Sequence, residues 1–96
     1  MTMPAAHIGS ITTGHGCWPP TVVATGASTV IGSIAPLSRI GDIAIPHNCS
    51  PIGSHGLAVA IGSTTVITEN MPAARIGDLM TCGDVIATGD TTIIIG

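Results

Sequence analysis

The sequence of 96 residues has no lysine, phenylalanine or tyrosine, and Trp18 is its single aromatic residue. Arg39 and Arg75 are its only strong bases, and the formal net charge is -3. Nucleic-acid binding needs clusters of lysine and arginine to neutralise phosphates, so this composition argues against a nucleic-acid partner. No apolar run reaches the roughly 20 residues of a membrane-spanning helix, so no transmembrane segment is expected.

The N-terminus also lacks a basic segment followed by an apolar one, so no secretory signal peptide is expected. If the protein leaves the cell, a route other than general export must carry it. The low-charge, apolar composition favours a protein partner that covers part of the surface.

Hydrophobic residues make up 45% of the chain, and they are mostly isoleucine, valine and alanine. Threonine and glycine are also abundant. This composition is typical of short strands joined by many turns and predicts an all-β fold. A chain this short buries a limited core and is often helped by a metal, a disulfide or a partner.

One short segment occurs three times. Residues 72–78 and 36–42 share the pattern Pro-x-x-Arg-Ile-Gly-Asp, and residues 4–10 are a weaker copy with His7 and Ser10 in place of arginine and aspartate. A second element, a turn followed by β-branched residues, also occurs three times and is expected to form strands. Its copies are residues 26–32, 62–68 and 89–95.

The spacing of these elements predicts three related units in one domain, residues 1–96. The proline follows the glycine of the second element by ten positions in both 26–42 and 62–78, which indicates a strand, a turn and a returning strand in fixed register. The intervals between units vary, as loops do. The approximate repeats are 4–35, 36–71 and 72–96, and they predict approximate three-fold symmetry. The short, unequal spacings disfavour the alternative, a linear solenoid.

Each unit places one metal-type ligand just after its Gly-Asp turn or the equivalent turn. His15 and His47 follow Ser10 and Asp42 by five positions, and Cys82 follows Asp78 by four. Rotation symmetry would bring these side chains together near the axis, and the longest loop adds His55. Three imidazoles and one thiolate complete the tetrahedral shell of a structural zinc site and leave no position for a reactive water.

Cys17 and Cys49 each follow a candidate ligand by two positions. They could form a disulfide, lie beside the metal in its second shell, replace a histidine as ligand, or pack as small apolar side chains. Packing or a disulfide is favoured over ligation. Three cysteines leave one unpaired in any disulfide scheme. His7 is interpreted as a structural substitution and not as a ligand.

The remaining polar residues show no catalytic pattern. Arg39 with Asp42 and Arg75 with Asp78 are interpreted as ion pairs that stabilise turns and not as an acid–base or phosphate site. Glu69, Asp84 and Asp90 are scattered, and no serine lies in a nucleophile elbow. Trp18 is expected to pack within its loop, with the alternative that it anchors a partner.

The repeats resemble the PAAR family. The resemblance is carried by residues 72–78, by the Gly-x-x-x-Val strands, by Gly14-His15-Gly16 and by Cys82-Gly83. It implies a small cone of β-strands with a triangular base and a metal near the sharp apex. In that family three histidines and one cysteine hold zinc, which implies one zinc per chain at His15, His47, His55 and Cys82. Iron is the alternative metal, since these ligands suit both.

The resemblance also implies a role. Such proteins are not enzymes; they cap the trimeric β-helical spike of type VI secretion systems and contractile phage tails, and sharpen it for piercing an envelope. The implied partner is a VgrG-like or phage central spike, one chain per trimer, with strand edges at the base continuing its hydrogen bonding. The protein would be cytoplasmic before assembly and then travel outside on the spike. Because the chain ends at Gly96, effector cargo is expected to bind separately. The cysteine context slightly favours a phage tail.

Two functions of other classes stay open from the residues alone. A small zinc hydrolase would need an open coordination position and a nearby general base. A binding module stapled by Cys17 and Cys49 would lose stability under reductant but not under chelator.

Overall fold

The computed structural model describes residues 2–96, and this range forms strands and no helices. The all-β prediction is therefore confirmed. The strands are β1 (Met3–Ala5), β2 (Ile43–Cys49), β3 (Gly53–Ala58), β4 (Ile67–Thr68), β5 (Met71–Pro72) and β6 (Asp90–Ile95). They pair antiparallel as β1–β6, β2–β3 and β4–β5. Within residues 2–96, no helix is long and apolar enough to cross a membrane.

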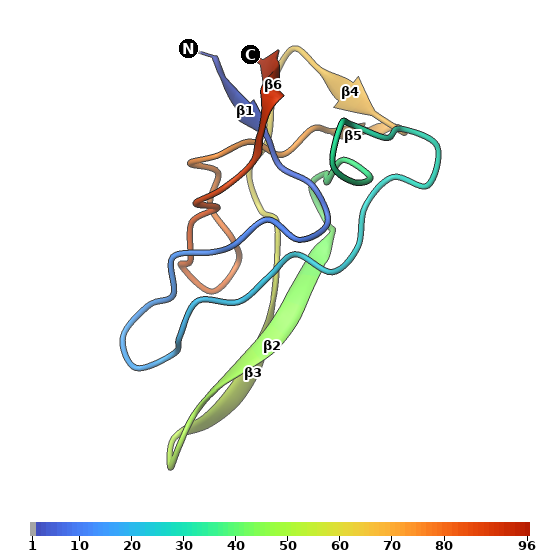
Figure 1. Ribbon diagram of the computed structural model, residues 1–96. Helices are drawn as coiled ribbons and strands as arrows, with labels where there is room; N and C mark the ends of the chain where they lie inside the picture. Colours follow the sequence, from blue (N-terminus) through green and yellow to red (C-terminus); the bar gives the residue numbers. More distant parts are fainter. Residues whose placement is uncertain (1) are drawn as a thin grey trace.

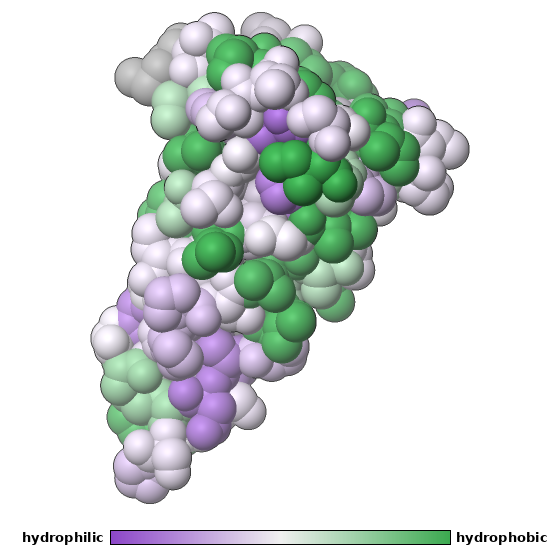
Figure 2. Space-filling view, in the orientation of Figure 1, coloured by the Kyte–Doolittle hydropathy of each residue, from purple (hydrophilic) through white to green (hydrophobic). Residues whose placement is uncertain are grey.

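The molecule tapers from a wide end to a narrow one and measures 39 × 26 × 20 Å along its principal axes (Figures 1 and 2). β1, β4, β5 and β6 lie at the wide end, and the β2–β3 hairpin runs toward the narrow end (Figure 1). We call the wide end the base; it comprises β1, β4, β5, β6 and residues 26–35. We call the narrow end the tip; it comprises residues 13–21, 45–56 and 81–84.

A closed ring of backbone hydrogen bonds relates the three repeats. The amide of Ala6 donates to the carbonyl of Ala74, Ala74 donates to Ser38, and Ser38 donates back to Ala6, each at 2.9 Å. These residues occupy the same position in the three Pro-x-x segments. A second ring links Ile8 to Pro36, Ile40 to Pro72 and Ile76 to Pro4 at 2.9–3.0 Å. Equivalent residues therefore make equivalent bonds around one axis, as the repeat spacing predicts.

The expected pairing of each strand with a following proline segment is present, but most strands are shorter than expected. The matched pairs are Ile31 with Pro36, Ile67 with Pro72 and Ile94 with Pro4. The third copy therefore closes the ring by pairing with the first. Only the third copy forms a full strand, β6, while residues 26–32 contribute a single bridge. Each segment pairs over only a few residues, because the chain then turns away from its partner and enters the hydrogen-bonded ring that the three repeats share.

Glycine is required where these segments approach that ring. A Cβ on Gly26, Gly62 or Gly89 would lie only 2.6–2.8 Å from a backbone carbonyl oxygen. The three oxygens belong to Leu37, Ala73 and Ala5, which are again equivalent residues. The repeated glycine thus has a steric cause, because a methyl group would displace backbone and not a flexible side chain.

Two small apolar clusters fill the interior. The cluster at the base contains Ala5, Leu37, Ala73 and Ile95, with Val30, Val66 and Ile93 packed against it. The cluster further toward the tip contains Ala6, Ala44, Leu57, Val59, Ala74, Met80 and Ile86, with Ile40 and Cys82 at its edge. Because the side chains near the axis are small, the backbone segments of the three repeats can approach one another there.

The Arg-x-x-Asp segments form the turns between ring and loop. The Asp78 carboxylate accepts the Arg75 backbone amide at 2.7 Å and pairs with the Arg75 guanidinium at 2.7 Å. Arg39 and Asp42 repeat this arrangement at 2.7 and 3.1 Å. In the first repeat the Ser10 hydroxyl accepts the His7 amide at 3.0 Å. The common requirement of the turn is therefore an acceptor for that amide, and the ion pair is an addition in two repeats.

Candidate metal centre

Four side chains from all three repeats meet at the tip. His47 on β2 and His55 on β3 are direct partners in the hairpin register. His15 comes from the loop of the first repeat, and Cys82 from the loop of the third. One ligand atom from each residue lies within 4.8 Å of the others, which is a spacing that could hold a metal ion.

The donor atoms are closely spaced within this group. The Nε2 atoms of His47 and His55 are 2.9 Å apart. The Cys82 sulfur lies 3.8 Å from Nδ1 of His15, and the His15 and His55 rings are stacked with centroids 5.0 Å apart. Two ring nitrogens this close must share a hydrogen or bind a common cation. The arrangement suits a soft or borderline ion held by nitrogen and sulfur.

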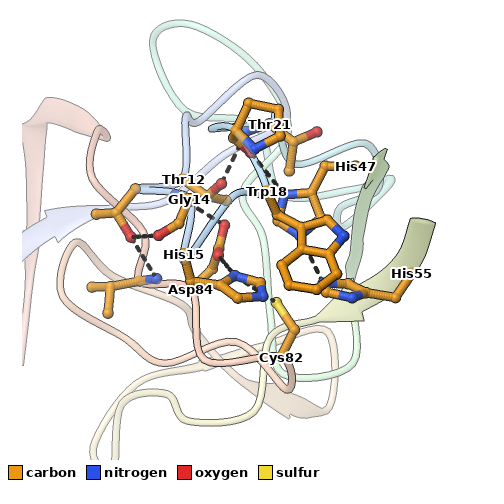
Figure 3. A network of polar contacts seen from close by, with 12 residues as sticks. Thr12, Gly14, His15, Trp18, Thr21, His47, His55, Cys82 and Asp84 are labelled. Atoms are coloured by element: carbon orange, nitrogen blue, oxygen red, sulfur yellow. Dashed lines mark hydrogen bonds and ion pairs between the residues drawn. The ribbon is translucent and has the colours of Figure 1, made fainter. Parts of the chain in front are cut away.

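In His47 and His15, the ring nitrogen Nδ1 contacts a residue outside the four-residue cluster (Figure 3). Nδ1 of His47 lies 2.7 Å from the carbonyl oxygen of Pro19, so this nitrogen carries the hydrogen and donates it. Nδ1 of His15 contacts the carboxylate of Asp84. Fixing Nδ1 as donor leaves Nε2 with a free lone pair, which is the form that binds a metal.

The protonation states of His55 and Asp84 also favour the binding of a cation. Withdrawal from water, followed by the neighbouring imidazoles of His47 and His15, lowers the pKa of His55 below its usual value. His55 is therefore neutral at neutral pH, as a ligand must be. Burial alone would raise the pKa of Asp84, but hydrogen bonds from Thr12, His15 and Gly14 outweigh it and leave that pKa below its usual value. Asp84 is therefore a carboxylate.

Trp18 covers one side of the cluster. Its ring centroid lies 5.2 Å from that of His15 and 4.6 Å from that of His55. Its indole Nε1 donates to the carbonyl of Gly53 at 2.9 Å, which connects the first loop to β3. Trp18 is therefore a packing residue of the tip that limits access of water to the histidines.

Cys17 and Cys49 form a disulfide with their Cα atoms 5.5 Å apart. Cys82 is the free cysteine of the chain. The disulfide joins the loop that carries His15 to the strand that carries His47, in each case two residues beyond the histidine. It therefore lies beside the cluster as a crosslink and leaves the thiol of Cys82 as the available sulfur ligand.

Other residues considered from the sequence lie elsewhere. His7 is buried in a turn, where its Nδ1 contacts the carbonyl of Ile8. Arg39, Asp42, Arg75 and Asp78 belong to the turns described above and not to the cluster. Across residues 2–96, His15, His47, His55 and Cys82 are the one group of three or more such side chains that could share an ion.

Asp84 is the site residue that sequence reasoning did not find. In the sequence it is one of several scattered acids, and no repeat supplies a matching aspartate. A weak signal was its position two residues after Cys82. Only the fold shows that Asp84 faces His15, because these residues are 69 positions apart.

The model of the PAAR motif matches residues 50–96, which include His55, Cys82 and the third Pro-x-x-Arg segment. No curated protein sequence matches the chain. The PAAR motif implies a spike-tip role in a type VI secretion system or a contractile phage tail, and a VgrG-like spike as the kind of partner. The fold and the matched motif agree: residues 50–96 carry the PAAR motif, and proteins of this motif family are structural spike tips and not enzymes.

Proposed function

We propose that this protein caps the trimeric β-helical spike of a contractile injection machine, with its base on the spike and its zinc-bound tip leading into the target envelope. One chain sits on each trimer. The observation that carries the proposal is the three-fold arrangement of the base. A single chain with three equivalent faces can meet three identical spike chains in the same way.

Exposed apolar side chains recur on the base at equivalent positions. Ile31, Ile67 and Ile94 each follow the glycine of their repeat by five residues, and they are 61, 61 and 53% exposed. Hydrophobic residues gather over the wide part of the molecule, and polar ones over part of the narrow end (Figure 2). An exposed apolar surface of this kind favours a protein partner.

The zinc site supports the same role at the other end. His15, His47, His55 and Cys82 supply four nitrogen and sulfur ligands, which is the closed shell of structural zinc. The ion would hold together loops that are too short to bury an apolar core of their own. Iron is the alternative ion, since histidine and cysteine ligands suit both metals, and elemental analysis distinguishes the two.

Metal content tests the zinc site. Elemental analysis should find about one zinc per chain in the wild type and none in His15→Ala or Cys82→Ala. His7→Ala is the control, because His7 lies in a turn away from the cluster. At free zinc 1,000-fold above its dissociation constant, the ion contributes about 4 kcal/mol. Its loss should then lower Tm by roughly 15–30 °C for a chain of this size. A metal-free, equally stable wild type would contradict the zinc site.

Spike binding tests the base. Ile67→Asp should weaken binding to a purified trimeric β-helical spike at least about tenfold, because a charge would replace one of the three equivalent exposed apolar side chains of the base. Ile52→Asp is the matched control, since Ile52 is 68% exposed but lies at the end of the tip hairpin. Titration calorimetry would also give the stoichiometry, expected at one chain per trimer. Weakening by Ile52→Asp alone would reverse the proposed orientation.

A further inference from the structure

We propose that Asp84 is the positioning residue of the tip metal site: its buried carboxylate orients His15 and supplies the charge that neutralises the bound ion. The inference rests on the proposed zinc site. It assigns a role to a residue outside the four ligands, and a defined substitution can test it separately.

Asp84 is completely buried, with a relative exposure of 0%. Its carboxylate contacts Nδ1 of His15 and accepts the backbone amide of Gly14 at 3.2 Å. It also accepts the hydroxyl of Thr12. The Thr12 oxygen in turn accepts the amide of Thr21 at 3.0 Å, so its hydrogen is free for Asp84 (Figure 3). The carboxylate is thus held by one stretch of the first loop, from Thr12 to His15.

No arginine or lysine is available to balance this buried charge. The chain has two such residues, and Arg39 and Arg75 are paired with Asp42 and Asp78. A buried charge without a partner is costly in free energy. The group that faces Asp84 is instead His15, a ligand of the proposed site.

The charges of the loaded site then sum to zero. A divalent ion carries +2, the Cys82 thiolate contributes -1, and the Asp84 carboxylate contributes -1. Neutral histidines add nothing. Three histidines and one thiolate alone would leave the loaded site with one positive charge, and Asp84 removes it.

The contact also orients the imidazole. A carboxylate can only accept a hydrogen bond, so Nδ1 of His15 must be the donor and Nε2 keeps its lone pair. In Figure 3 the His15 ring lies between the Asp84 carboxylate on one side and the Cys82 sulfur on the other. Carboxylates that hold a ligand histidine in this way fix its tautomer and strengthen its basicity, and their loss typically weakens metal binding about 10- to 100-fold.

The test is Asp84→Asn, which keeps the shape and removes the charge. Zinc affinity would be measured by competition with a chromophoric chelator, and the visible spectrum would be recorded after loading with Co²⁺. We expect about 10- to 100-fold weaker zinc binding and a shifted Co²⁺ spectrum, because the basicity of His15 changes. Asp90→Asn is the control. Asp90 is 1% exposed and hydrogen-bonded by Ser33 and Thr92, but it lies at the base.

The outcomes separate this inference from the proposed function. If wild type binds zinc and Asp84→Asn binds it as tightly as Asp90→Asn, the role of Asp84 is wrong and the zinc site stands. If wild type binds no zinc, both fall. Should Asp84→Asn fail to fold, Thr12→Val removes one hydrogen bond from the carboxylate and keeps its charge. A several-fold weaker affinity is then expected, and unchanged affinity would overturn the inference.

Discussion

The base and the tip of this small protein are stabilised in different ways. In the base, equivalent residues of three repeats form closed rings of backbone hydrogen bonds, and the side chains near the axis are small. In the tip, the links between different repeats depend on side chains: a disulfide, a cluster of four metal-type ligands and the hydrogen bond from the Trp18 indole to the Gly53 carbonyl. Backbone symmetry therefore supports the wide part, and crosslinks replace it where the molecule narrows.

The lengths of the loops explain this change. The proline-to-glycine intervals of the three repeats are 22, 26 and 17 residues, so the loops cannot follow one symmetric path. Each loop supplies different chemistry: the first gives His15, the second gives His47 and His55, and the third gives Cys82. Three unequal loops that converge on a point have little apolar surface to bury, and a few strong crosslinks are the alternative to a core.

The largest effect is expected from breaking a crosslink of the tip. Reduction of the Cys17–Cys49 disulfide, which spans 32 residues, should lower the free energy of unfolding by about 3–4 kcal/mol through the greater freedom of the unfolded chain. For a domain of this size the fall in Tm is roughly 10–30 °C. Differential scanning calorimetry with and without a phosphine reductant measures it.

The matched control is the Cys17→Ser/Cys49→Ser double variant. It should start at the lower Tm and show no response to reductant. Equal stability of oxidised and reduced wild type would mean that the tip is held by its other contacts, and the contrast between base and tip would lose its covalent part.

A single methyl group should disturb the base more than the tip. Gly89→Ala would place a Cβ 2.6 Å from the carbonyl oxygen of Ala5 and 3.1 Å from Ile76. Forcing a methyl group against backbone should cost about 1–3 kcal/mol. In the tip hairpin, a Cβ on Gly56 meets no atom within 4 Å, so Gly56→Ala should change stability by less than about 0.5 kcal/mol. Urea unfolding of both variants compares the two regions, and equal losses would contradict the steric role of the repeated glycine.

The sequence predicted the base better than the tip, for a physical reason. A constant spacing between repeated residues indicates a packed scaffold. The repeated ten-residue interval from Gly26 to Pro36 was therefore enough to predict that each strand pairs with the proline segment that follows it. Strand length was less predictable, because it depends on where the chain leaves its partner to join the central ring. In the tip, the repeat offsets drew attention to His15, His47 and Cys82. Asp84 has no counterpart in the other repeats, and only the fold brings it beside His15.

The smallest effect is expected from the ion pairs of the turns, because the first repeat already replaces the pair with His7 and Ser10. Asp78→Ser should keep an acceptor for the Arg75 amide, as Ser10 does for His7, and lose only the ion pair. The partly exposed pair contributes at most about 1 kcal/mol. Asp78→Ala should cost about 1–3 kcal/mol more, since the amide then loses its acceptor.

Thermal unfolding at low and 1 M salt distinguishes the two contributions. Salt should reduce the difference between wild type and Asp78→Ser, because it screens the ion pair, and leave most of the difference between the two variants. If Asp78→Ser were as unstable as Asp78→Ala, the ion pair and not the amide acceptor would define the turn, and Ser10 would then make the first repeat the weakest of the three.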